Sequence, residues 1–183
     1  LIRLAGDAGA WQVLFYRSIG MVPVLAGLVA LTTGGRVMAA MAATGRAGIA
    51  CGFGLVVAFF GAIYSMQNTT IANAVFLFAA SPLMTAILSR PILGERVRPA
   101  TWAAIAIAAV GIYLMVRDGL SAGAGRGNAA ALASAAGFSV FTLALRSARL
   151  SDMTPAILIG ALASIVAAAL FIQIRAESFA LPP

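Results

Sequence analysis

Long apolar stretches follow one another along the whole chain, separated by short connections that carry glycine, proline or charge. A helix that crosses a bilayer needs about 20 consecutive and mostly apolar residues. Six stretches meet that requirement, at 11–32, 47–66, 71–89, 100–116, 128–146 and 154–174. The pattern therefore predicts an all-α membrane protein, built as a transmembrane bundle of about six helices.

The composition supports a membrane location and excludes several functions. Hydrophobic residues make up 62% of the chain and charged residues 9%, whereas soluble domains have about 45–50% and about 25%. Histidine is absent and Cys51 is the single cysteine, so we expect no disulfide within the chain, no metal and no cofactor. The sequence shows no nucleophile–base pair and no phosphate-binding loop, which disfavours an intramembrane enzyme.

The net charge of +7 comes from twelve arginines that stand singly or in small groups between the apolar stretches. No basic stripe could follow a phosphate backbone, so nucleic acid is not an expected partner. If the six spans alternate in direction, one membrane side receives Arg36, Arg46, Arg90, Arg96, Arg98, Arg146 and Arg149, and the other receives Arg3, Arg117, Arg126 and Arg175. The positive-inside rule makes the first side cytoplasmic and places Leu1 outside. The Ala- and Arg-rich composition favours a bacterial inner membrane.

Two stretches carry a family resemblance. SPLMTAILSRPILGERVRPATWAAIAIAAVGIYLMV (81–116) has Pro82 inside a span, the turn Gly94-Glu95-Arg96, and an Ala-rich helix after it. GDAGAWQVLFYRSIG (6–20) has a short loop that leads into a helix with an early arginine. In order and spacing these features resemble the drug/metabolite transporter superfamily, in its EamA-like branch.

The resemblance implies a fold of ten helices in two inverted repeats of five, with the solute path between the repeats. Residues 1–118 would form the first repeat without its first helix, 119–127 a small and flexible linker, and 128–183 the start of the second repeat. One further helix is then expected before Leu1 and three after Pro183. The implied function is a permease that moves a small metabolite or drug-like solute by alternating access. A subunit or truncated product that only packs with partner helices stays open, as does a homodimer.

Arg17 is the charged residue that lies within a span. It follows Trp11 by six residues, so at about 1.5 Å per residue it lies roughly 9 Å deeper in the membrane than that interfacial anchor. Its side chain either reaches back to the interface or makes a structural bond, or it faces a polar cavity in the substrate path. Both interpretations stay open, and Arg17 is a substrate-path candidate.

The other substrate-path candidates are uncharged polar residues. Phe60, Tyr64 and Gln67 share one helical face, and Asn68 follows at the outer turn. A tyrosine with nearby amides can bind a small solute in an apolar pocket. The alternative is that the amides cap helix ends. The full set is Tyr64, Gln67, Asn68, Asn73, Ser81 and Ser139, with Pro82 as a helix kink that frees a backbone carbonyl.

Serines in the fifth span can be explained without a role in the substrate path, because hydroxyls within a helix often bond to the backbone of their own helix. This applies to Ser134 and Ser139. Glu95 lies among Arg90, Arg96 and Arg98 in the turn that follows Gly94, so a salt bridge or a helix cap is expected there. No expected span contains Asp or Glu, although proton-coupled carriers usually keep an intramembrane acid.

Overall fold

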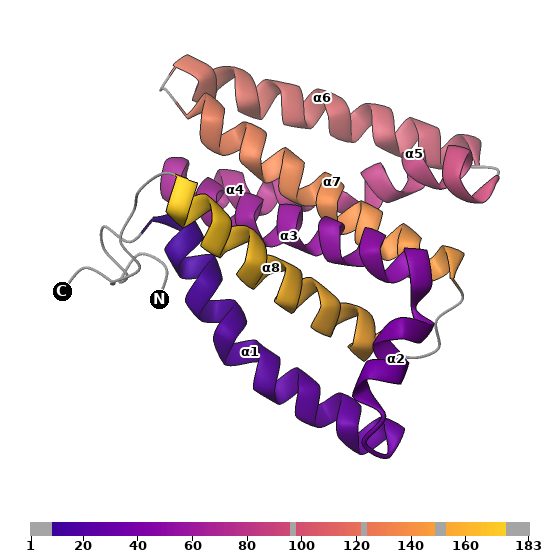
Figure 1. Cartoon of the computed structure of the whole chain (residues 1–183). Helices are drawn as coiled ribbons and strands as arrows, with labels where there is room; N and C mark the ends of the chain where they lie inside the picture. The colour runs from indigo at the N-terminus through magenta and orange to yellow at the C-terminus, as the bar shows by residue number, and fades with distance from the viewer. Residues whose placement is uncertain (1–8, 96–97, 122–123, 149–152, 175–183) are drawn as a thin grey trace.

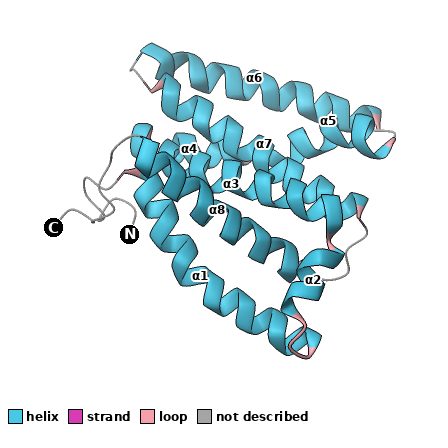
Figure 2. Ribbon diagram, in the orientation of Figure 1, coloured by secondary structure: helices cyan, strands magenta, loops and turns pink. Residues whose placement is uncertain are grey.

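The computed structural model describes residues 9–95, 98–121, 124–148 and 153–174. Within these ranges the chain forms helices and no strands (Figure 2), which confirms the expected all-α class. The helices are α1 (Ala10–Thr33), α2 (Val37–Ala43), α3 (Gly45–Asn68), α4 (Ile71–Phe78), α5 (Ser81–Leu93), α6 (Pro99–Ser121), α7 (Gly125–Ser147) and α8 (Thr154–Ile174).

Five helical segments of the described chain are long and apolar enough to cross a membrane. They are α1, α3, α7, α8 and the segment Ile71–Leu93, which contains α4 and α5. The sixth expected span corresponds to α6, whose apolar stretch Pro99–Leu114 is shorter than the other five. The structure thus confirms a membrane helix bundle, with five spans of full length among the described residues.

Three connections differ from the sequence expectations. The polar connection after α1 contains the short helix α2. The expected third span is interrupted, because α4 ends at Phe78 and α5 begins at Ser81, although Ala79 and Ala80 between them keep a right-handed helical backbone. Pro82 lies in the first turn of α5, directly after this interruption, and the kink expected there stays a prediction. Of the expected linker 119–127, residues 119–121 belong to the end of α6 and residues 125–127 to the start of α7, and the division into two repeats at this point stays a prediction.

Helix α3 is the centre of the bundle (Figure 1). Its most extensive contact is with α7, and it also packs along α8. Helix α1 packs mainly on α8, while α4 and α5 pack on α7. Helix α6 lies along the outer side of α7 and makes few contacts elsewhere (Figure 1). The packing therefore decreases from the α3–α7 pair toward α6.

Glycines allow α3 and α7 to approach backbone to backbone. A Cβ atom added to Gly54 would lie 2.7 Å from the carbonyl oxygen of Gly137, and one added to Gly137 would lie 2.7 Å from that of Gly54. The hydroxyl of Ser134 on α7 donates a 2.6 Å hydrogen bond to the carbonyl of Ala58 on α3. Small residues and interhelical hydrogen bonds hold helices together where lipid supplies no hydrophobic drive.

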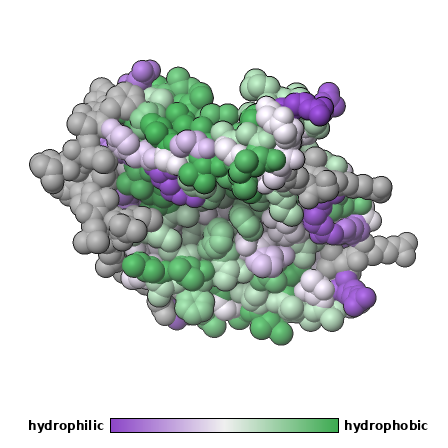
Figure 3. Space-filling view, turned by 90° about the horizontal axis from the view of Figure 1, so that it is seen from below, coloured by the Kyte–Doolittle hydropathy of each residue, from purple (hydrophilic) through white to green (hydrophobic). Residues whose placement is uncertain are grey.

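Contacts at the two ends of the bundle match the alternation of the spans. At one end, Glu95 after α5 pairs with Arg146 near the end of α7. At the other end, Thr69 after α3 donates a hydrogen bond to Asn128 at the start of α7. Much of the surface in Figure 3 is hydrophobic, with strongly hydrophilic side chains gathered at the right-hand edge of the view and a smaller hydrophilic group left of its centre. Such a surface suits a bundle surrounded by lipid.

Candidate functional site

A cavity lies between α1 and α3, and we name it the Arg17 cavity. Its volume is about 180 Å³, and it is lined by Val13, Arg17, Phe59, Ala62, Ile63 and Met66. Apart from the guanidinium, the lining side chains are hydrocarbon or thioether groups. The arginine that the sequence places inside a span thus lines a half-open cavity between two spanning helices.

The guanidinium of Arg17 is held by an aromatic ring. Its Cζ atom lies 3.8 Å from the centroid of the Phe59 ring, a cation–π contact that stabilises by about 0.5–2 kcal/mol. This contact satisfies none of the N–H donors, and Nη1 is buried with no hydrogen-bond partner among the described residues. The helices α1, α3, α4, α5, α7 and α8 contain no Asp or Glu that could pair with it. The site therefore combines a positive charge with a free hydrogen-bond donor.

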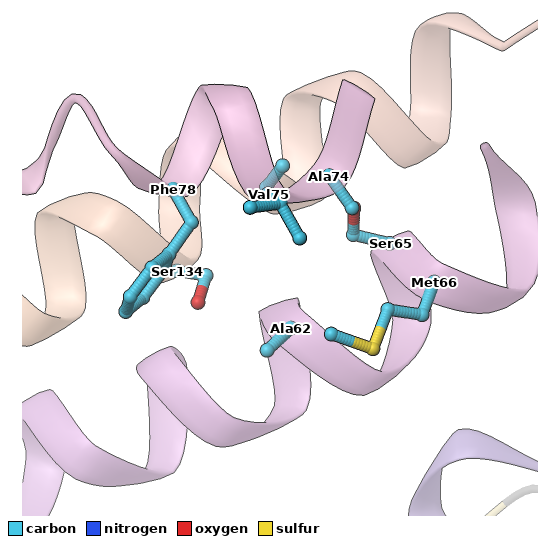
Figure 4. A pocket seen from close by; sticks show the side chains of 8 residues that line it. Ala62, Ser65, Met66, Ala74, Val75, Phe78 and Ser134 are labelled. Carbon is cyan, nitrogen blue, oxygen red and sulfur yellow. The ribbon is translucent and has the colours of Figure 1, made fainter. Parts of the chain in front are cut away.

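A second cavity lies between α3, α4 and α7, and we name it the Ser65 cavity (Figure 4). Its volume is about 160 Å³, and it is lined by Ala62, Ser65, Met66, Ala74, Val75, Phe78, Ala131 and Ser134. Ser65 is fully buried, and its hydroxyl has no hydrogen-bond partner in the described structure. The hydroxyl of Ser134 is occupied by its bond to Ala58. The cavity is thus apolar except for one unpartnered hydroxyl.

The two cavities adjoin along α3. Ala62 and Met66 line both of them, so the flexible thioether side chain of Met66 belongs to the wall that they share. Figure 4 shows the Met66 side chain extending along the Ser65 cavity toward Ala62. Sites for small molecules usually have volumes of about 300–1,000 Å³. Each cavity alone is smaller than that.

Tyr64 lies in an aromatic cluster next to the Arg17 cavity. The Trp11 ring stacks on Phe60 with centroids 3.7 Å apart and on Phe171 with centroids 4.3 Å apart. The ring of Tyr64 lies 5.7 Å from that of Phe60. The cluster joins α1, α3 and α8 at the end of the bundle where α1 begins. Tyr64 lines neither the Arg17 cavity nor the Ser65 cavity.

The candidate amides are distributed over different places. Gln67 and Asn68 are exposed at the end of α3, and the Nδ2 of Asn68 donates a 2.8 Å hydrogen bond to the carbonyl of Tyr64, as expected for an amide that caps a helix end. Asn73 is half-buried in the first turn of α4, where its N–H donates to Thr70. The amides therefore form no common site with Arg17.

Asn73 instead lines an open groove between α4 and α6. The groove has a volume of about 570 Å³ and is formed by Ala72, Asn73, Phe76, Ala108, Gly111 and Ile112. Asn73 is its polar side chain, and the other residues are apolar. The groove follows from the sparse packing of α6, which contacts α7 more than α4.

Ser81 and Ser139 are brought together at the contact between α5 and α7. The hydroxyl of Ser139 lies 2.9 Å from the carbonyl of Ser81 and 2.8 Å from that of Ala135 in its own helix. Thr85 donates to the same Ser81 carbonyl. Ser139 thus bonds both to its own helix, as expected, and to the start of α5, next to the break before Pro82. Neither serine lines the two cavities beside α3.

The turn after α5 makes the expected salt bridge with an unexpected partner. Gly94 ends α5 with a left-handed backbone (φ 68°), which glycine adopts at little cost. The Oε1 atom of Glu95 lies 2.6 Å from Nη2 of Arg146 in α7, rather than beside Arg90 or Arg98. About half of each side chain is exposed. Arg96, the third residue of this predicted turn, lies outside the described residues.

Sequence reasoning missed the residues that line the cavities beside Arg17. Phe59, Ala62 and Met66 are spaced three and four residues apart on α3, a spacing that could have been found by asking which face of α3 meets α1. Ser134 bonds to α3 and not to its own helix. Asn128 was also missed, although it is almost fully buried and its Nδ2 has no partner in the described part of the chain.

The fold and the site together indicate the class of protein. The chain is a multi-pass membrane helix bundle with cavities inside its spanning segments, and no cluster of potential metal ligands occurs among the described residues. The model of the EamA-like transporter family matches residues 2–117, more than half of the 183 residues. The chain therefore belongs to the EamA-like transporter family, which confirms the resemblance. The comparisons with curated proteins and with solved structures gave no match.

Proposed function

We propose that the protein is a permease that moves a small solute by alternating access, and that the solute passes the Arg17 and Ser65 cavities. Membership of a transporter family supports transport as the activity. The observation that carries the assignment of the path is Arg17, whose Nη1 is buried in a cavity between spanning helices without a hydrogen-bond partner among the described residues.

The energetics favour a functional role for this arginine. Placing an arginine at the centre of a spanning helix costs about 2.5–3.5 kcal/mol on insertion scales. The cation–π contact with Phe59 offsets part of this cost and leaves Nη1 without a hydrogen-bond partner among the described residues. A purely structural arginine would be expected to bond to carbonyls or an acid. A solute that accepts hydrogen bonds would supply the missing partner.

The broken helix α4–α5 supports the same path. Discontinuous spanning helices commonly border the binding sites of secondary transporters, because the break exposes backbone groups and allows motion. Here the break follows Phe78, which lines the Ser65 cavity, and precedes Ser81. The inverted-repeat arrangement and the boundary between repeats near residues 119–127 are part of this proposal.

The orientation is also part of the proposal. The end of the bundle with Arg36, Arg46, Glu95 and Arg146 is assigned to the cytoplasmic side of a bacterial inner membrane by the positive-inside rule. In cells, Arg36→Cys and Arg46→Cys variants would react with a membrane-impermeant maleimide only after the membrane is opened. Labelling of intact cells would reverse the orientation.

Transport is tested with the intact gene product in proteoliposomes. The vesicles are incubated with an equimolar mixture of amino acids, monocarboxylates including benzoate, dicarboxylates, sugars, nucleosides and polyamines, and their contents are quantified by mass spectrometry. At least one solute is expected to enter faster than it enters protein-free vesicles. The Arg17→Ala variant should reduce that flux at least tenfold, whereas the control Arg36→Ala, at an exposed arginine outside the spans, should leave it unchanged.

Two outcomes would contradict this proposal. If no solute enters faster than in protein-free vesicles while the protein is folded, the non-transporting subunit becomes the better account. If flux occurs and folded Arg17→Ala protein transports as well as the unmodified protein, the path does not pass Arg17. Size-exclusion profiles of each variant establish that folding is intact.

A further inference from the structure

The charge of the Arg17 cavity limits which solutes can be bound there. The guanidinium contributes one positive charge, and no Asp or Glu occurs in α1, α3, α4, α5, α7 or α8 to cancel it. The other lining residues of the cavity are apolar. An unpaired charge in such surroundings is costly, so the ligand that stabilises the site most is one that cancels a single charge.

The geometry of the cation favours a carboxylate over other anions. A guanidinium presents parallel N–H donors that match the two oxygens of a carboxylate, and such charge-assisted bonds are about twice as strong as neutral ones. A phosphate monoester would bring up to two negative charges to one arginine and leave an excess charge in the membrane interior. A neutral amide would accept a hydrogen bond but would leave the arginine charge uncompensated.

The space beyond the guanidinium is apolar. It is bordered by Phe59, Ala62 and Met66, and Ala62 and Met66 also line the adjoining Ser65 cavity, where Ser65 has a buried hydroxyl without a partner in the described structure. Pockets of this composition bind hydrocarbon and aromatic groups by excluding water from both surfaces. Met66 is an adaptable wall because its side chain is unbranched and flexible.

We propose that the site selects a small monocarboxylate with an apolar body, whose carboxylate pairs with Arg17 and whose body lies along Met66 toward the Ser65 cavity. This inference rests on the proposed permease function, since it names the class of solute for the same path. It goes beyond that function by excluding neutral solutes and phosphate esters.

The preference is tested by titration calorimetry on the purified intact protein with three probes that share one ring. These are benzoate, benzamide and phenyl phosphate. Benzoate is expected to bind at least tenfold more tightly than either of the other two. Arg17→Gln should weaken benzoate binding at least tenfold and remove its advantage over benzamide, and Arg17→Lys should retain part of it. The control Arg36→Gln should bind benzoate as the unmodified protein does.

The comparison of probes on the unmodified protein keeps the test decisive even if an Arg17 variant does not fold. Equal or tighter binding of benzamide or phenyl phosphate, or no binding of benzoate, would overturn the monocarboxylate preference. If the vesicle assay showed flux of neutral solutes alone, the result would support the permease function and contradict the monocarboxylate preference. Benzoate binding without flux of any solute would contradict the permease function and support the anion site.

Discussion

The two sides of α3 are built in opposite ways. Toward α7 the helix presents Gly54, Ala58 and Gly61, and the backbones approach so closely that a Cβ added to either glycine would meet a carbonyl oxygen at 2.6–2.7 Å. Toward α1 and α4 it presents Phe59, Ala62 and Met66, and these line two cavities together with Ser65, although Ala131 and Ser134 of α7 also border the cavity beside Ser65. One helix therefore has a sealed side and a hollow side.

This difference indicates that the sealed side of α3 is a rigid scaffold and that the hollow side is the candidate binding site. On the sealed side, close packing and the Ser134–Ala58 hydrogen bond fix α3 against α7. On the hollow side, buried polar groups such as Arg17 Nη1 and Ser65 Oγ lack partners in the described structure. Native proteins rarely keep such groups without a reason. The rigid α3–α7 pair thus gives a fixed wall against which a solute and a moving helix can be placed.

Adding a large side chain on the sealed side of α3 should reduce the stability of the fold more than the other substitutions. In Gly137→Leu the new side chain would meet the backbone of Gly54 and Ala58, which cannot move aside as a side chain can. The expected cost is about 3 kcal/mol or more, because overpacking forces the helices apart. The purified variant should lose its folded peak in size-exclusion chromatography and melt at lower temperature. The control Gly27→Leu, with open space around an added Cβ, should behave as the unmodified protein.

Filling the hollow side should impair transport without unfolding the protein. In Met66→Trp the larger side chain would occupy the wall shared by both cavities, so flux of the transported solute should fall at least tenfold. The melting temperature should change little, since the added volume enters existing space. Met38→Trp, at an exposed methionine of α2, is the control. Normal flux through folded Met66→Trp protein would separate the cavities from the path.

A matched pair of serines, both on the wall of the Ser65 cavity, compares a hydroxyl that has a hydrogen-bond partner with one that has none among the described residues. Ser134→Ala removes the bond to Ala58 and should destabilise the fold by about 0.6–1.7 kcal/mol, the range measured for hydrogen bonds between membrane helices. Ser65→Ala removes a buried hydroxyl without a hydrogen-bond partner in the described structure, so stability should stay equal or rise slightly. Chemical denaturation in mixed micelles measures both. A larger loss of stability in Ser65→Ala than in Ser134→Ala would contradict this expectation.

The salt bridge at the end of the bundle should contribute least to the stability of the fold. Glu95 and Arg146 are about half exposed, and exposed pairs contribute about 0–1 kcal/mol because water and salt screen them. Glu95→Gln and Arg146→Gln should each change the melting temperature only slightly, and the double variant should show little further change. The difference should vanish at high salt. A loss as large as that of Ser134→Ala would show that this end holds the bundle together.

Much of the fold could be predicted, because apolar runs of spanning length can be recognised directly in the sequence. The interruption between Phe78 and Ser81 was expected only as a kink at Pro82, since a proline is compatible both with a kink and with the first turn of a helix. The partner of Glu95 was also missed. Arg146 is 51 residues away, and its proximity depends on how α5 and α7 pack.

The site could be predicted only where a residue was conspicuous. Arg17 stands out as a charge inside an apolar stretch, whereas Ser65 and Met66 resemble ordinary residues of a spanning helix. Their place beside the cavities depends on the rotation of α3 relative to α1 and α4, which periodicity alone does not determine. The amides of Gln67 and Asn68 were easy to notice, but they lie at an exposed helix end.

The most direct test compares water access to the two sides of α3. In a Cys51→Ala background, Ala62→Cys places a thiol on the wall that both cavities share, and Ala58→Cys places one on the sealed side. A small, charged methanethiosulfonate reagent is applied to the reconstituted protein, and modification is followed by mass spectrometry. The account predicts that the thiol of the Ala62→Cys variant reacts readily and that of the Ala58→Cys variant does not. Equal rates, or faster reaction on the sealed side, would contradict it.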